Sequence, residues 1–88
     1  MSYLVKFAPS AQETLDRLPS EITERIINKL SEAKEFPEHY LIRLKGTNEF
    51  KLRVGDYRAI ILADMSNRVL KVQAIGHRKN IYKKYKTD

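Results

Sequence analysis

The stretch that decides the fold is FKLRVGDYRAII, residues 50–61 of this 88-residue chain. Its Gly-Asp pair at 55–56 suits a two-residue hairpin turn and predicts two antiparallel strands, Phe50 to Val54 and Tyr57 to Ala63. This register sets Arg53 opposite Arg58. Because neighbouring residues of a strand point to opposite faces, apolar side chains gather on one face and cationic ones on the other. The apolar face holds Phe50, Leu52, Val54, Tyr57, Ala59 and Ile61, and the other face holds Lys51, Arg53 and Arg58.

A third strand follows this hairpin along the chain. Residues 64–67 are rich in turn formers, and the next run, Arg68 to Ile75, is again typical of a strand. A four-residue turn would set Ile61 opposite Leu70 and Arg58 opposite Gln73, and it would keep Ala74 on the apolar face beside Tyr57. On the other face we expect three side chains to continue the polar row: Lys71, Gln73 and, beyond Gly76, His77.

The first half of the chain predicts two helices. Tyr3 to Phe7 favours a first strand, and Ser10 with Glu13 three residues on indicates a capping box that opens a helix. A second helix begins after Pro19, and Pro37 is expected to end it because proline has no backbone N–H to donate. One face of the first helix carries Ala11, Leu15 and Leu18, and one face of the second carries Ile22, Ile26, Ile27, Leu30 and Ala33.

The remaining segments complete an α+β fold. Leu41 to Lys45 favours a strand, and Asn80 to Lys86 favours a short C-terminal helix or an extended tail. We therefore expect an N-terminal strand and a two-helix hairpin packed on one face of a mainly antiparallel sheet of four to five strands. Residues 1–88 are expected to form a single domain, since the chain is shorter than one typical domain.

Composition restricts the compartment and the chemistry. The sequence has no cysteine, which excludes disulfides and thiolate metal sites. It has no apolar run near the roughly 20 residues of a membrane span, and its first ten residues do not resemble a signal peptide. We expect a cytoplasmic protein with no membrane partner. His39 and His77 lie far apart in the sequence and no acidic residues cluster at ligand spacing, so we expect no metal and no cofactor.

The net charge of +6 is unevenly distributed along the chain. Residues 1–44 hold six basic and seven acidic side chains, whereas residues 45–88 hold eleven basic and four acidic ones. A one-sided basic field attracts nucleic acid, anionic lipid or an acidic protein, although solvated surface cations are the simpler interpretation. Arg53 and Arg58 are opposed like charges, which disfavour a sheet. They are either splayed into solvent or gathered for an anion such as phosphate.

The C-terminal segment adds aromatic rings to these charges. His77 and Arg78 follow the last strand, and tyrosines then alternate with cations up to residue 86. This pattern suits single-stranded RNA, because rings stack on bases and cations meet phosphates. The predicted RNA-binding residues are Lys45, Lys71, Lys79, Lys83, Lys84 and Tyr85.

Three motifs in combination resemble one known family. They are Leu44-Lys45-Gly46, the stretch from Phe50 to Arg58, and Ile75-Gly76-His77-Arg78-Lys79 followed by Tyr82. Together they resemble the RelE/ParE toxin superfamily, and within it the RelE-type mRNA interferases; the similarity covers nearly the whole chain. The resemblance implies the toxin of a type II toxin-antitoxin pair. Such a toxin is a ribosome-dependent endoribonuclease that cleaves mRNA in the A site by 2′-hydroxyl attack and inhibits translation.

The resemblance also implies the catalytic residues, which are Lys51, Arg53, Arg58, Arg78 and Tyr82. Arg58 is expected to stabilise the transition state and Arg78 the leaving group, while Tyr82 stacks on a base or orients the 2′-hydroxyl. Lys51 is the expected general base, because two neighbouring arginines favour its neutral form. Arg53 and His77 stand where relatives often have lysine, and His77 is the alternative base.

The expected partners are an antitoxin protein in a heteromeric complex, the ribosome and mRNA. Ile60, Leu62 and Val69 on the basic face offer a mixed surface for an amphipathic antitoxin helix. Two alternatives stay open: a ParE-like toxin that binds DNA gyrase and cleaves nothing, and a catalytically weak module that binds RNA or an antitoxin. We further expect Arg58 to point into solvent, so that the fold tolerates Arg58→Ala.

Overall fold

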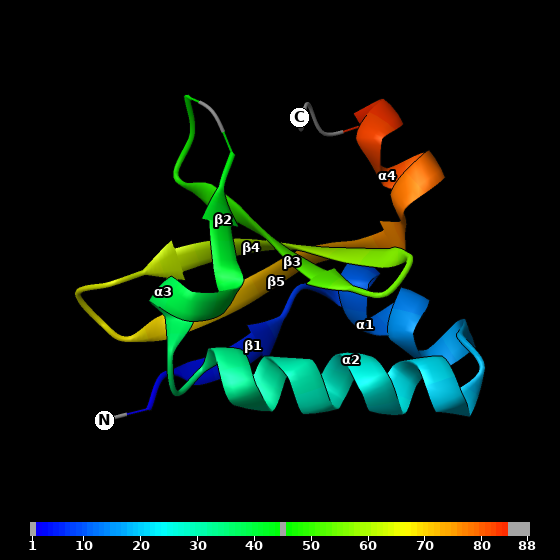
Figure 1. The fold of residues 1–88 in the computed structure, drawn as a ribbon, viewed down its shortest axis with the longest axis horizontal. Helices are drawn as coiled ribbons and strands as arrows, with labels where there is room; N and C mark the ends of the chain where they lie inside the picture. The colour runs from blue at the N-terminus through cyan, green and yellow to red at the C-terminus, as the bar shows by residue number, and fades with distance from the viewer. Residues whose placement is uncertain (1, 45, 85–88) are drawn as a thin grey trace.

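The computed structural model describes residues 2–44 and 46–84, with the backbone alone at 82–84. Among these residues, no helix has the length and apolar character needed to cross a membrane. In chain order the elements are β1 (Leu4–Phe7), α1 (Pro9–Arg17), α2 (Ser20–Ala33), α3 (Pro37–Tyr40), β2 (Leu41–Arg43), β3 (Glu49–Val54), β4 (Tyr57–Asp64), β5 (Val69–His77) and α4 (Arg78–Lys84), as Figure 1 shows.

The strands form one five-stranded sheet in the order β1-β5-β4-β3-β2. β1 runs parallel to β5, and the other neighbouring pairs are antiparallel. α1 and α2 lie on one side of the sheet, and α4 rises on the other side (Figure 1). The predicted α+β class, with a helical hairpin on a mainly antiparallel sheet, is therefore confirmed, and the C-terminal segment is a helix as far as it is described.

The hydrophobic core lies between the sheet and the two helices α1 and α2. Ala11 and Leu15 from α1 are buried, as are Ile26, Leu30 and Ala33 from α2. The helices therefore bury most of the faces that their apolar periodicity predicts, except that Ile27 of α2 is exposed. On the sheet, these residues pack against Leu52, Val54, Ala59, Ile61, Leu70 and Val72, which the strand alternation places on the apolar face.

The predicted hairpin of β3 and β4 has the expected register. Arg53 pairs with Arg58, and Val54 pairs with Tyr57. Gly55 has a φ of 59°, in the left-handed region that a β-carbon disfavours, so the backbone of this turn requires glycine. The helix side of the turn is also crowded, because a Cβ on Gly55 would lie 2.7 Å from Nη2 of Arg25 in α2.

The predicted register of β4 and β5 is wrong. Ile61 pairs with Val72 instead of Leu70, because β4 runs on to Asp64 and the turn takes residues 65–68. The Asp64 carboxylate holds this turn by accepting hydrogen bonds from the side-chain amide and the backbone N–H of Asn67, at 2.8 and 3.1 Å. These bonds favour the charged form and lower the pKa of Asp64, the side-chain amide most of all.

An irregularity between Ile60 and Ile61 then reverses the faces of the last residues of β5. Ala74 pairs with Ile60 and so lies on the α4 side of the sheet, where it packs against the cluster beneath α4. Ile75 takes the place in the core that the sequence predicts for Ala74. A strand that gains one residue relative to its neighbour shows the opposite faces from that point on.

Two predicted helix boundaries are also wrong. The first helix begins at Pro9 after Ala8, with no side-chain cap, so the predicted capping box does not form. Ser10 lies inside the helix, and its hydroxyl donates instead to the backbone oxygen of Gln73 at 3.5 Å. Pro37 begins α3 rather than ending α2, which stops at Ala33. Proline is well tolerated in the first turn of a helix, where its missing N–H has no intrahelical partner.

A second, smaller apolar cluster fixes α4 to the sheet. Ile81 of α4 is buried together with Leu44 and Ile60, and Ala74 packs against them. Gly76 lies next to Ile81, since a Cβ there would be at van der Waals distance, 3.4 Å, from the Cβ of Ile81. The prediction that Ile60 is an exposed part of an antitoxin-binding surface is therefore wrong, since α4 covers it.

Replacing Ile81 with alanine should release α4 from the sheet. The change removes the apolar anchor of the helix, and we expect the free energy of unfolding to fall by about 2–4 kcal/mol. Chemical denaturation measures this loss, and hydrogen exchange should show faster exchange in α4 than in β4. Ile27→Ala is the matched control, because Ile27 is 39% exposed; an equal loss in both variants would contradict the anchoring role of Ile81.

Candidate active site

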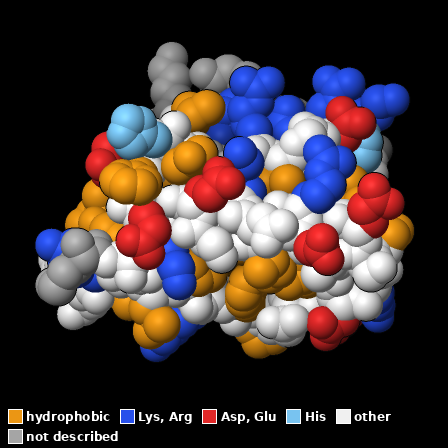
Figure 2. Space-filling view, turned by 60° about the horizontal axis from the view of Figure 1, so that its bottom comes forward, with side chains coloured by type: hydrophobic (Ala, Val, Ile, Leu, Met, Phe, Trp, Pro, Cys, Tyr) orange, Lys and Arg blue, Asp and Glu red, His pale blue; other side chains and the backbone are white. Residues whose placement is uncertain are grey.

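Three of the cations predicted to share one sheet face, Lys51, Arg53 and Arg58, lie at neighbouring positions of β3 and β4. Figure 2 shows Lys and Arg side chains crowded at the top of the view, whereas acidic side chains are scattered over the face below. Arg53 of β3 is exposed and pairs directly with Arg58 of β4. The structure therefore keeps these two like charges on neighbouring strands.

Arg58 differs from its neighbour in being buried. Its side chain is 6% exposed, and its Nη1 donates hydrogen bonds to the backbone oxygens of Gly55 and Tyr57, both at 2.8 Å. The guanidinium is thus folded against the β3–β4 turn. The expectation that Arg58 points into solvent is wrong, because the turn presents two carbonyl oxygens that this side chain can reach.

Lys51 lies further along the same face and is also buried, with 9% of its surface exposed. In the sheet it stands between Ile42 of β2 and Ile60 of β4. Since Ile60 is covered by α4, Lys51 lies in a partly apolar setting beside the two arginines. The sequence predicts that Lys51 shares a sheet face with Arg53 and Arg58. In the structure the three residues lie at neighbouring positions on that face.

Arg78 joins this group from the start of α4. Its backbone N–H donates to the backbone oxygen of Asp56 at 2.8 Å, and its Nε lies 3.4 Å from Oδ1 of the same residue. The Arg78 side chain is 52% exposed. Arg53, Arg58 and Arg78 therefore all lie next to the β3–β4 turn.

His77 does not belong to this face. Opposite Tyr57 in the sheet, its ring meets the Tyr57 ring edge-on with centroids 5.5 Å apart. Its Nδ1 accepts a hydrogen bond from the backbone N–H of Lys79 at 3.2 Å, which leaves Nε2 as the protonated nitrogen of the neutral ring. The prediction that His77 lies beside Lys71 and Gln73 is wrong, and the cause is the reversal of faces in β5.

The other predicted residues are more dispersed. Lys71 is exposed, but it pairs with Leu62, four residues along β4 from Arg58, which corresponds to roughly 13 Å at 3.3 Å per residue. Lys79 is exposed in the first turn of α4. Tyr82, Lys83 and Lys84 continue this helix, whereas Lys45 and Tyr85 fall outside the described residues. Within the described part of the chain, no group of three or more His, Cys, Asp or Glu side chains could hold a metal ion.

The sequence reasoning missed two residues at this site. From the sequence, Asp56 is predicted only as a turn residue, although it is the one acidic residue between Arg53 and Arg58. Arg25 gave no signal, because its place in α2 belongs to a solvated helix face. Their contacts with Arg78 and Gly55 depend on how α2, the turn and α4 meet in space.

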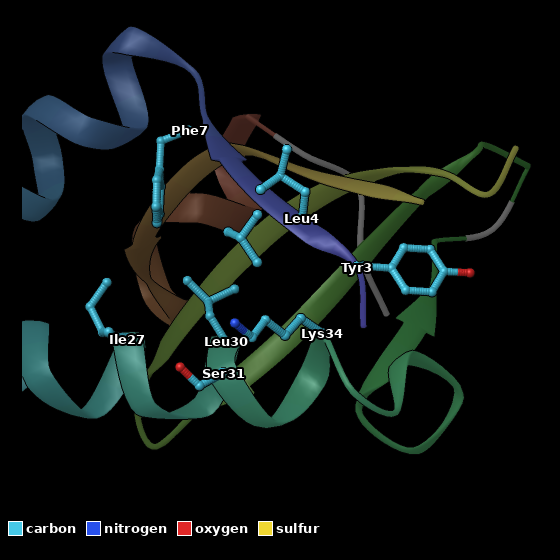
Figure 3. A pocket seen from close by; sticks show the side chains of 8 residues that line it. Tyr3, Leu4, Phe7, Ile27, Leu30, Ser31 and Lys34 are labelled. Carbon is cyan, nitrogen blue, oxygen red and sulfur yellow. The ribbon is translucent and has the colours of Figure 1, made fainter. Parts of the chain in front are cut away.

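A separate pocket of about 240 Å³ lies between β1 and α2. Figure 3 shows Phe7 of β1 and, across the pocket, Ile27 and Leu30 of α2. The lining is mostly apolar, with Ser31 and Lys34 at α2. It lies on the helical side of the sheet, so it is not part of the cationic site.

Comparisons with known proteins give a consistent result. A family model described as the ParE toxin of the type II toxin-antitoxin system parDE matches residues 5–82. A comparison with curated proteins gives no significant match. Among solved structures, the toxin-antitoxin complex RelBE2 from Mycobacterium tuberculosis has a chain with a TM-score of 0.78 at 22% identity, over 89% of this chain and 100% of that one.

Two further solved structures are similar at slightly higher identity. The archaeal RelE-RelB complex from Pyrococcus horikoshii OT3 matches with a TM-score of 0.77 and 26% identity, over 91% of this chain and 99% of that one. The intact Escherichia coli RelBE toxin-antitoxin complex matches with a TM-score of 0.74 and 27% identity, over 86% of this chain and 96% of that one. The fold of this chain is therefore that of RelE toxins.

Arg58→Ala should destabilise the protein, in contrast to the expectation from sequence. The two carbonyl oxygens at the turn lose a buried donor, and we expect the free energy of unfolding to fall by about 1–3 kcal/mol. Arg53 lies opposite Arg58 and is exposed, so Arg53→Ala should change the free energy of unfolding by less than about 0.5 kcal/mol. Denaturant titration of both variants measures the difference; equal stability of the two would show that the turn does not depend on Arg58.

Proposed function

The chain belongs to the ParE toxin family of type II toxin-antitoxin systems, and from this premise we propose that it is a RelE-type endoribonuclease. It would cut mRNA in the ribosomal A site and so stop translation. The observation that carries this proposal is the meeting of Arg53, Arg58 and Arg78 around one turn, with Lys51 on the same sheet face. Guanidinium groups bind phosphate oxygens through paired N–H donors, so the cluster suits an RNA backbone.

The proposed reaction uses the RNA's own nucleophile. The 2′-oxygen forms a bond to the adjacent phosphorus and the bond from phosphorus to the 5′-oxygen breaks, which leaves a 2′,3′-cyclic phosphate and a 5′-hydroxyl. Lys51 in its neutral form takes the proton of the 2′-hydroxyl, and the leaving 5′-oxygen gains one from the site or from solvent. Arg78, which is half exposed at the rim, would stabilise charge on that oxygen.

The burial of Arg58 fits a stabilising role in this reaction. Its Nη1 is held by two carbonyl oxygens, so its charge has a fixed position before the substrate arrives. A preorganised charge in a poorly solvated place stabilises developing negative charge better than a mobile one in water. Exposed Arg53, opposite Arg58, would hold the neighbouring phosphate oxygens.

The proposed protein partner is an acidic antitoxin. The similar chains from M. tuberculosis, P. horikoshii and E. coli come from toxin-antitoxin complexes. The net charge of +6 on this chain also calls for an acidic complement, because complementary fields speed association and favour the right partner. Of the mixed surface predicted for such a partner, Leu62 and Val69 remain at least partly exposed, whereas Ile60 does not.

A second candidate function is the inhibition of DNA gyrase by binding, without cleavage of nucleic acid. The family model favours it, because its description names the ParE toxin. A gyrase-binding toxin needs no general base, so loss of Lys51 would have little effect on it. The two functions therefore differ in their target and in the residues that they require.

The two candidate functions can be separated in one experiment. Purified protein is added to mRNA with and without ribosomes, and primer extension locates the cuts; supercoiling by gyrase is measured in parallel. We expect cuts at A-site codons in the presence of ribosomes only, and gyrase activity that does not change. Arg53→Ala should reduce cleavage at least about tenfold, whereas Arg17→Ala, an exposed α1 arginine, should not. Gyrase inhibition with intact mRNA would overturn the nuclease proposal.

Lys51 and His77 can be compared directly as general bases. Lys51 lies on the face of the opposed arginines, whereas His77 lies beside Tyr57 on the other face. Under single-turnover conditions, Lys51→Ala should slow cleavage by about 100-fold or more, the usual contribution of a general base. His77→Ala should keep a near-normal rate. With ribosome binding intact in both, the reverse result would assign the base to His77.

A further inference from the structure

We propose that Asp56 is a positioning residue for Arg78, an inference that rests on the proposed nuclease function. Two contacts join the residues across the gap between the β3–β4 turn and α4. The backbone oxygen of Asp56 accepts the N–H of Arg78 at 2.8 Å, and the carboxylate Oδ1 lies 3.4 Å from Nε. One residue therefore contacts both the backbone and the side chain of Arg78.

Arg78 needs such a constraint because its side chain is 52% exposed. An exposed arginine samples many rotamers, whereas a charge that stabilises a transition state must be in place before the reaction. The carboxylate contact given by the structure is to Nε, whereas an arginine also carries two terminal amino groups. These groups carry the paired donors that bind phosphate. Asp56 thus restrains the guanidinium without occupying the edge that would meet the substrate.

Asp56 is itself held in a rigid turn. On one side, the buried Arg58 guanidinium donates to the backbone oxygens of Gly55 and Tyr57, the residues that flank Asp56. On the other side, the Arg25 guanidinium lies against Gly55. The carboxylate therefore projects from a turn whose backbone is hydrogen-bonded to Arg58, and this turn supports its contact with Arg78.

A simpler interpretation makes the opposite prediction. Aspartate is common in two-residue hairpin turns, and an exposed ion pair contributes little to stability. If Asp56 were only a turn residue, its negative charge would repel the phosphates of the RNA. Its removal would then strengthen binding and leave the cleavage rate equal or higher. If Asp56 positions Arg78, its removal slows the chemical step although the site becomes more positive.

The test is Asp56→Asn, which keeps a turn-forming residue and removes the charge. Single-turnover cleavage of ribosome-bound mRNA, at saturating ribosome complex, should slow at least roughly tenfold, with binding no weaker than in the wild type. Asp64→Asn is the matched control, because it removes one charge from the β4–β5 turn at the other end of β4; its rate should stay within about twofold, the small effect expected of a surface change. Asp56→Glu, which keeps the carboxylate, should retain more of the rate than Asp56→Asn.

The remaining outcomes separate this inference from the proposed function. In an Arg78→Ala background, Asp56→Asn should cause no further loss, because Asp56 acts through Arg78; an independent loss would overturn the inference. A wild-type rate in Asp56→Asn would also overturn it and leave the nuclease proposal intact. A wild-type protein that cuts no mRNA overturns the proposed function. The contact itself is tested without activity, since NMR relaxation of the Arg78 Nε–H group should show greater mobility in Asp56→Asn.

Discussion

Two hydrogen bonds from the buried Arg58 guanidinium to the carbonyl oxygens of Gly55 and Tyr57 hold the β3–β4 turn. Carbonyl groups at a tight turn point away from the strand ladder, and leaving partly buried ones without donors costs stability. Here a side chain from the adjoining strand satisfies both. Since Asp56 lies between these carbonyls and contacts Arg78, the position of α4 at the sheet also depends on this turn.

The two faces of the sheet carry different tasks. The face toward α1 and α2 buries the large apolar side chains and supplies most of the stability. The face toward α4 holds only a small apolar cluster around Ile81, and it also carries the opposed pair Arg53 and Arg58. Directly opposed like charges weaken a sheet by a few tenths of a kcal/mol or more. Because the apolar core on the opposite face supplies most of the stability, the protein can tolerate this unfavourable pair of arginines.

The parts of the structure that the sequence predicts are those governed by local rules. Gly55 and Asp56 fix the turn of the hairpin, and the alternation of its strands then places Arg53 opposite Arg58. The register of β5 could not be predicted, because the non-glycine residue Arg68 adopts a φ of 55° and Gln73 adds a residue to the strand. Neither feature has a sequence signal; the turn at Arg68 shifts the register by two residues, and the extra residue at Gln73 moves His77 to the other face.

The burial of the site could not be predicted either, because it depends on contacts between distant segments. Ile60 and Lys51 alternate with core residues and read as exposed positions of an open sheet face. Ile60 is buried by packing with Leu44 and with Ile81, which lies some twenty residues later in the chain. The Arg58 side chain folds inward because the neighbouring turn presents backbone carbonyl oxygens to it. The direction of these carbonyl groups cannot be predicted from the residue types.

The way the cations are held bears on the choice between a toxin that binds and a toxin that cuts. A surface that only attracts an acidic partner needs positive charge, and exposed side chains such as Lys71 and Lys79 provide it while remaining solvated. Burying the Arg58 guanidinium and restraining Arg78 on Asp56 add order that attraction alone does not require. Catalysis does require it, because a charge stabilises a transition state only when it stands at the right place beforehand. The restrained arginines therefore favour chemistry on a phosphate over simple binding.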